Sequence, residues 1–152
     1  MKKLAIILAI ILACGAAEAA SVTSPTVLAW EQPQADLIIP AGQTLRPLNK
    51  WIMYVRDVPG GPAVSFLDIA YDASKLTGPV NGFMTYTSVP IAITATGTGG
   101  TTVQKCFVVT AYGNHTPPPP KETAPSNEVC KNFVLPPDPI TAPGPAQNLR
   151  VQ

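Results

Sequence analysis

The stretch that most constrains the fold is Lys105–Val134, because two cysteines, Cys106 and Cys130, bracket a proline-rich interior. On the N-terminal side of that interior, Phe107, Val109 and Ala111 alternate with Cys106, Val108 and Thr110. This period of two is expected for a strand that has two unlike faces. β-Branched and aromatic residues dominate there, which suits a pleated, half-buried surface. We therefore predict a β-hairpin with strands at Lys105–Tyr112 and Ser126–Val134.

The two cysteines also predict a register for this hairpin. If Cys106 lies opposite Cys130 in an antiparallel pair, Tyr112 lies opposite Ala124, and the segment Gly113–Thr123 forms the tip. The tip then contains the strand-breaking Gly, Asn, His and Pro residues. A disulfide at this place would close a loop of about 25 residues and contribute about 3 kcal/mol. The alternative is a pair of buried free thiols.

The N-terminus has the pattern of a signal peptide over residues 1–20. Lys2 and Lys3 form a basic start, Leu4–Ala13 is an apolar run, and Ala17-Glu18-Ala19 supplies the small-x-small pattern of a cleavage site. The apolar run of about ten residues is too short to span a bilayer as a helix. The sequence thus predicts a bacterial protein that is secreted or periplasmic, with no transmembrane span.

Cys14 supports a second interpretation of the N-terminus. The order Ala13-Cys14-Gly15 resembles a bacterial lipoprotein processing site, although Leu12 is unusual two positions before the cysteine. A lipid anchor on Cys14 is therefore the alternative to ordinary secretion. Both interpretations leave the other two of the three cysteines as an even pair, which favours a disulfide in an oxidising compartment.

Composition limits the remaining chain to one domain, at residues 21–134, and a proline-rich linker and strand-like tail at residues 135–152. Charged residues are only 12% of the sequence and nearly cancel, so no strong field favours nucleic acid. The 18 prolines and 11 glycines break the chain into short strands and turns. These features predict an all-β protein.

Alternation and turn residues predict four further strands, and the segments between them are expected to be irregular connections. Within the strand Lys50–Val58, Trp51, Met53 and Val55 form one face. Within Thr85–Thr96, Val89 is expected to point inward, and the neighbouring Pro90 suggests a sheet edge or a bulge. The strands are Thr26–Gln32, Lys50–Val58, Ala63–Ile69 and Thr85–Thr96; the connections include Gln34–Asn49, with an edge segment at Leu37–Ile39, and Ala73–Gly82.

Two features of these segments have a structural and a functional interpretation. Trp30 is either a core residue of a sandwich or a platform for stacking a sugar. Asp68 and Asp72 have the spacing of one helical turn, so they are either solvated residues beside a turn or a pair for acid–base chemistry or calcium. Calcium needs six or more oxygen ligands and a closed zinc site needs four soft ones, and neither set is visible. We predict no metal and no cofactor.

Several segments together resemble the fibronectin type III family. The resemblance spans Thr26–Phe133 and rests on short motifs that identify a fold better than an activity. It implies an immunoglobulin-like two-sheet sandwich in which Trp30 is buried. The matching segments are VLAWEQP for the second strand, KWIMYV for the third, and CFVVTAYGN with ETAPSNEVC for the sixth and seventh.

The chain departs from the family at two places. Lys105 stands where the family has the tyrosine of its corner hydrogen bond. Only Ser21–Pro25 remains for the first edge strand, whereas a pattern typical of that strand occurs in Pro143–Val151. This tail begins another module, is a disordered end, or fills the vacant edge in its own domain or a neighbour's by β-augmentation.

No residue has the surroundings expected of a catalyst, because the only histidine, His115, lies in a proline-rich loop. We therefore expect a non-enzymatic module that binds protein or polysaccharide. The alternative is a structural subunit that self-associates through Ala146–Gln152. The candidate binding loop contains Tyr112, Asn114, His115, Pro117, Pro118, Pro119 and Pro120.

Overall fold

The structure, a computed structural model, describes residues 19–114 and 121–138. Several predicted sites lie outside these residues: Cys14, His115, Pro117–Pro120 and the tail segment Ala146–Gln152. The signal-peptide prediction also falls almost wholly outside them. The helices of the described part include none that is both long and apolar enough to cross a membrane.

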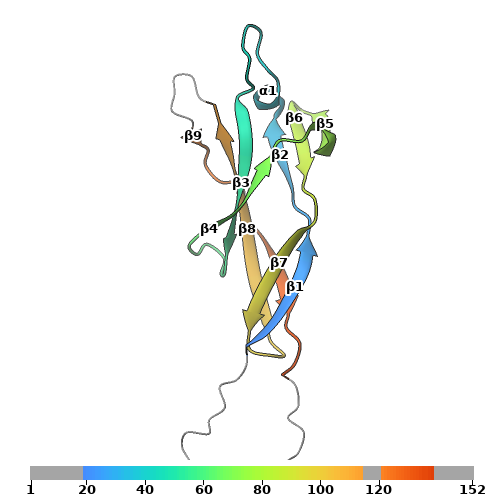
Figure 1. The fold of residues 1–152 in the computed structure, drawn as a ribbon, viewed down its shortest axis with the longest axis vertical. Helices are drawn as coiled ribbons and strands as arrows, with labels where there is room; N and C mark the ends of the chain where they lie inside the picture. The colour runs from blue at the N-terminus through green and yellow to red at the C-terminus, as the bar shows by residue number, and fades with distance from the viewer. Residues whose placement is uncertain (1–18, 115–120, 139–152) are drawn as a thin grey trace, which may run out of the picture.

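The described chain is built almost entirely of antiparallel strands, which confirms the predicted all-β class (Figure 1). One sheet has the order β10-β8-β3-β4, with β9 paired to β8; β2-β6-β5 and β1-β7 form two smaller groups. The elements are β1 (Ala20–Thr26), β2 (Ala29–Pro33), α1 (Gln34–Leu37), β3 (Leu48–Arg56), β4 (Val64–Ala70), the 3-10 helix η2 (Ala73–Lys75), β5 (Leu76–Val80), β6 (Phe83–Thr87), β7 (Ile91–Gly97), β8 (Thr102–Gly113), β9 (Lys121–Glu122) and β10 (Val129–Val134).

The two smaller groups form one interrupted ribbon that packs on the larger sheet. β1 leads into β2 and β6 leads into β7, with β1 beside β7 and β2 beside β6 (Figure 1). At the interruption, Leu28 and Ser88 exchange hydrogen bonds, with the Leu28 N–H donating to the Ser88 hydroxyl. The predicted strands Thr26–Gln32 and Thr85–Thr96 are therefore each divided, and Val89 is exposed rather than inward. Pro90 explains the second break, because it cannot donate to a ladder.

Strand β3 supplies the centre of the core, as its alternation predicted. Trp51 and Met53 are fully buried, and Val55 packs against the same cluster. The neighbouring β8 is buried without interruption from Cys106 to Ala111, so both of its faces are covered. A strand buried on both faces loses the simple inward–outward alternation.

Three predicted connections contain regular structure or core residues. Ala73–Gly82 contains η2 and β5, and its Asn81-Gly82 pair, with φ of 50° and 81°, turns the chain directly into β6. Asn-Gly is the sequence signal for such a two-residue hairpin turn. Gln34–Asn49 contains the single turn α1, which buries Leu37. The predicted linker begins with Leu135, which is 1% exposed and belongs to the core.

A candidate binding groove beside strand β2

Strand β2 has one edge that no strand covers among the described residues. The Leu28 carbonyl accepts from Ser88 and the Gln34 N–H donates to Gly82, both toward the β6 side. Backbone groups alternate in direction along an antiparallel strand, so Ala29 and Glu31 direct both their N–H and their C=O away from β6. Such an edge can accept an additional strand.

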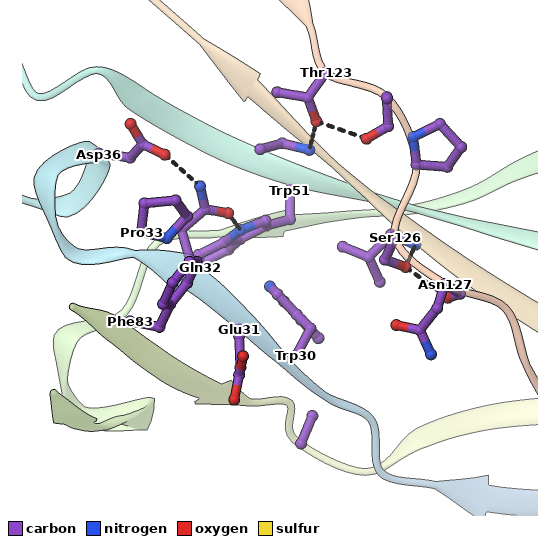
Figure 2. Close-up of a pocket in the computed structure, with 15 residues that line it drawn as sticks. Trp30, Glu31, Gln32, Pro33, Asp36, Trp51, Phe83, Thr123, Ser126 and Asn127 are labelled. Atoms are coloured by element: carbon purple, nitrogen blue, oxygen red, sulfur yellow. Dashed lines mark hydrogen bonds between the residues drawn. The ribbon is translucent and has the colours of Figure 1, made fainter. Parts of the chain in front are cut away.

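A groove of about 590 Å³ lies between this edge and the chain that returns from β9 to β10 (Figure 2). Strand β2 forms one wall and the segment Thr123–Asn127 forms the other. The floor comes from the core face of β3 and β8, and Phe83 of β6 closes one side. Its volume is in the usual range for ligand-binding clefts.

Side chains from three elements hold the floor of the groove in place. The Trp51 indole nitrogen donates to the Gln32 side-chain oxygen at 3.0 Å, and the Gln32 amide nitrogen donates to an Asp36 carboxylate oxygen at 2.7 Å (Figure 2). Gln32 is buried and therefore uses both ends of its amide. These bonds connect β3, β2 and α1, so the groove is preformed.

Trp30 lines the groove with a polar atom that has no partner. Its ring lies edge-on to Trp51, with centroids 5.4 Å apart, and stacks in a tilted arrangement on Tyr86 at 4.9 Å. The Trp30 indole nitrogen is buried and makes no hydrogen bond within the described residues. Trp30 is therefore a half-buried core residue that also faces the groove, as Figure 2 shows.

The groove carries negative charge. Glu31 and Asp36 line it, whereas no lysine, arginine or histidine does so among the described residues. Neither carboxylate forms an ion pair within the described part of the chain. A positively charged group on a ligand would complement this charge.

The opposite wall results from a departure from the predicted hairpin register. Cys106 lies opposite Cys130 as predicted, but Tyr112 pairs with Glu122 rather than Ala124. The five residues of β8 between these two pairs thus face seven residues of the returning chain, which has one extra residue at Asn127–Glu128 and one at Ala124–Pro125. Pro125 has no N–H to give to a ladder.

Two hydroxyl groups replace the lost ladder contacts along this bulge. The Val109 N–H donates to the Ser126 hydroxyl and the Ala111 N–H donates to the Thr123 hydroxyl, each at 3.0 Å. The backbone N–H groups of Ser126 and Thr123 donate in return to the carbonyls of Val109 and Ala111. The wall is therefore irregular in course but held to β8 at both Thr123 and Ser126.

Of the predicted binding loop, the structure describes Tyr112 and Asn114, and neither of them lines the groove. A second cleft of about 350 Å³ contains Asn114 and Lys121 and shares Gln32 and Asp36 with the first. Asn114 is fixed by its N–H to the Pro47 carbonyl at 2.7 Å. Tyr112 is half-buried rather than exposed as expected, with the Lys50 ammonium 5.2 Å from its ring centre.

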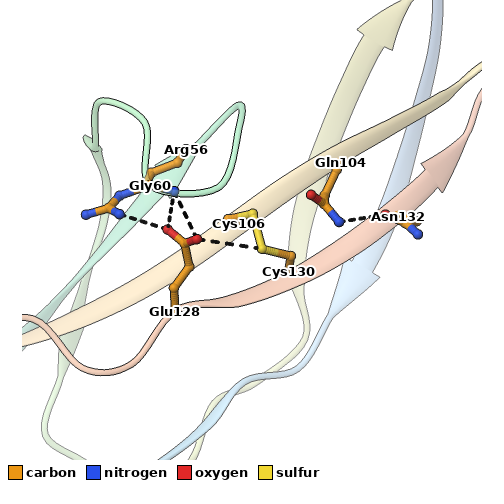
Figure 3. Close-up of a disulfide and its surroundings, with 7 residues drawn as sticks. All are labelled: Arg56, Gly60, Gln104, Cys106, Glu128, Cys130 and Asn132. Carbon is orange, nitrogen blue, oxygen red and sulfur yellow. Dashed lines mark hydrogen bonds and ion pairs between the residues drawn. A yellow bond between two sulfur atoms is a disulfide. The ribbon is translucent and has the colours of Figure 1, made fainter.

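The disulfide between Cys106 and Cys130 joins β8 to β10, with 4.0 Å between their Cα atoms. Glu128 lies beside it and receives hydrogen bonds from Arg56 at 2.8 Å and from the Gly60 N–H at 3.1 Å (Figure 3). Glu128, just before β10, thus connects the returning chain to the end of β3 and to the turn that follows it. Cys106, Cys130 and Glu128 are close enough to hold a metal, but the sulfurs are bonded to each other.

The two aspartates singled out by spacing do not form a pair. Asp68 belongs to β4 and makes an ion pair with Lys50. Asp72 accepts the N–H and the hydroxyl of Ser74, which lowers the pKa of its carboxyl. Each therefore has a local structural role, in agreement with the simpler of the two interpretations.

No family model, curated protein or solved structure matches this chain. The groove residues beyond Trp30 were missed by sequence reasoning, because a groove depends on which strand edges remain uncovered. Phe83, Gln32 and Asp36 carry no local motif. Pro33, which ends the alternating run, was the only local sign that β2 is an edge strand.

Proposed function

We propose that this protein is an exported, non-catalytic β-sandwich of the fibronectin type III type that binds an extended polypeptide along β2. The observation that carries the proposal is the uncovered edge at Ala29 and Glu31 beside a preformed groove. In β-augmentation, main-chain hydrogen bonds supply affinity and pockets for alternate side chains supply specificity. The edge offers the hydrogen bonds and the groove offers the pockets.

The polypeptide ligand is favoured over a polysaccharide by the way the aromatic rings pack. A sugar needs an open ring face for stacking. Trp51 is fully buried, and Trp30 already contacts Trp51 and Tyr86. The unpartnered indole nitrogen of Trp30 is better suited to a backbone carbonyl of an inserted strand.

Export is part of the proposal. The disulfide fits an oxidising compartment, and the leader-like N-terminus supplies a route to it. The resemblance to fibronectin type III domains supports the sandwich assignment, since the pairing of β10, β8, β3 and β4 has the order expected for strands seven, six, three and four. The uncovered edge of β2 corresponds to the place of the family's first strand, because the residues expected to form that strand belong to β1 and pair with β7.

The test compares binding of the full chain to a random decapeptide array and to an oligosaccharide array. Glu31→Pro removes an outward N–H and leaves the β2–β6 ladder intact, whereas Glu31→Thr keeps that N–H. We expect peptide binding that weakens at least tenfold in Glu31→Pro and persists in Glu31→Thr. Oligosaccharide binding that survives Glu31→Pro but not Trp30→Ala would contradict the proposal. Peptide binding that instead requires Pro117–Pro120 would move the site to the loop.

A further inference from the structure

We propose that the strand bound along β2 is the C-terminal segment Ala146–Val151 of a second copy of this chain. This inference rests on the proposed function, because it names the occupant of the same edge. Three observations carry it: the chemistry of the groove, the reach of the chain, and the position of Lys131.

The chemistry of the segment fits the groove. In an extended conformation, Leu149 and Val151 lie on one side and Arg150 on the other. A strand added beside β2 places the side chains of one of its faces next to Trp30 and Gln32, and those of its other face next to Glu31. Pairing that inserts the two apolar side chains therefore places Arg150 on the same face as the exposed Glu31, where opposite charges attract.

The reach of the chain favours a second copy over the chain's own segment. Asp138 lies against Gly99, at the end of the molecule where β1 begins. Ala29 lies nine residues beyond Ala20, so the path along the strands is about 30 Å. The nine residues from Asp138 to Gln147 span at most about 30 Å when fully extended. The chain's own segment would reach β2 without slack, and would run only parallel to it.

Lys131 lies on the path that the chain's own segment would follow. Its ammonium donates to the Pro25 carbonyl at 3.0 Å and to the hydroxyls of Ser24 and Thr26 at 3.1 Å. These contacts cover part of the outer side of β1. A segment that arrives from another copy enters directly at β2 and can pair antiparallel.

The resulting contact is head-to-tail, because the donating segment and the accepting edge are different surfaces of the chain. Each copy then accepts one strand and gives one strand. Contacts of this kind close into rings, the smallest of which is a dimer with reciprocal exchange, or continue into filaments.

The experiment uses full chains with complementary defects, and measures mass by size-exclusion chromatography with light scattering. Glu31→Pro blocks the edge, and Leu149→Asp blocks the donated segment. We expect the wild-type mass to grow with concentration, each variant to be monomeric, and their equimolar mixture to give a dimer. Leu149→Ile and Glu31→Thr are the matched controls. Leu149→Ile should assemble like the wild type, and Glu31→Thr, which keeps the N–H but loses the charge facing Arg150, should associate at most a few-fold more weakly. Ala29→Pro, which also removes only an outward N–H, replaces Glu31→Pro if that variant unfolds.

A wild-type chain that stays monomeric, or variants that assemble unchanged, would overturn the inference. Monomers at every concentration combined with a lower melting temperature for Leu149→Asp would assign the edge to the chain's own segment. A synthetic peptide of residues 143–152 separates the two proposals. If this peptide does not bind while other decapeptides bind in a Glu31→Pro-sensitive way, only the occupant is wrong. If no decapeptide binds in that way, the proposed function fails as well.

Discussion

At the scale of single residues, one carboxylate oxygen of Glu122 accepts hydrogen bonds from two hydroxyl groups beside β8. The Glu122 side chain accepts from the Thr110 hydroxyl at 2.5 Å and from the Tyr54 hydroxyl at 2.6 Å. The hydrogen bond from Thr110, followed by that from Tyr54, lowers the pKa of Glu122 below its ordinary 4.5. The bond to Glu122 in turn raises the pKa of Tyr54 above 10.0. This carboxylate links β9, β8 and β3.

The lowered pKa of Glu122 predicts an acid-dependent loss of stability. The unfolded chain binds the proton near pH 4.5 and the folded chain only at lower pH, so this contribution is complete above pH 4.5 and disappears as the pH falls below it. Glu122→Gln should remove this dependence and lower the free energy of unfolding at pH 7 by less than about 1 kcal/mol, because the site is exposed. Urea unfolding between pH 2 and 7 measures both effects.

Thr110→Val provides the control for that prediction, because it removes the first donor and keeps the carboxylate. The NMR titration of the Glu122 carboxyl carbon should then move to higher pH, toward the ordinary value. An acid profile for Glu122→Gln that overlays the wild-type profile would show that another group causes the acid loss.

At the scale of secondary-structure elements, the disulfide cross-links β8 to β10 next to the irregular stretch in which the returning chain departs from the ladder. Replacing Cys106 and Cys130 together by alanine should lower the free energy of unfolding by about 3 kcal/mol on the chain-entropy account. The effect should be largest on the exchange protection of the Thr123 and Ser126 amides, because these donate to β8 outside the regular ladder. Chemical denaturation and hydrogen exchange measure the two outcomes.

Reductant gives an independent check on this contribution. The wild type should lose a similar amount of stability under dithiothreitol, whereas the double alanine variant should not respond. Equal stability of oxidised and reduced wild type would mean that the disulfide adds nothing to the strand pairing of the hairpin.

These same elements show how far the sequence predicts the structure. The alternation in Lys50–Val58 predicted the buried face of β3, and the cysteine pair predicted the register at the base of the hairpin. The register at the tip was wrong because two hydroxyl side chains substitute for ladder groups, which no periodicity shows. The groove could not be predicted, since it arises where β2 lacks a neighbour and the chain bulges at Pro125, and both are long-range outcomes of strand pairing.

At the scale of the whole molecule, the predicted end of the signal peptide can be compared with the start of β1. Ala20, the first residue of β1, pairs with Gly97. Cleavage after Ala17-Glu18-Ala19 would leave β1 complete. Processing at Cys14 would instead leave six more residues and an acyl group ahead of the first strand.

The proposal of export predicts a specific mature chain. Expressed in a bacterial host with its own N-terminus, the protein should be recovered from the periplasm or medium with an intact mass that starts at Ala20 or Ser21. Free-thiol labelling should find no thiol, because Cys14 is removed and the other two cysteines are joined. A membrane-bound product with an acylated Cys14 would support the lipid-anchored alternative, and Cys14→Ser would then release it. Cytoplasmic recovery of the full chain with three free thiols would contradict export altogether.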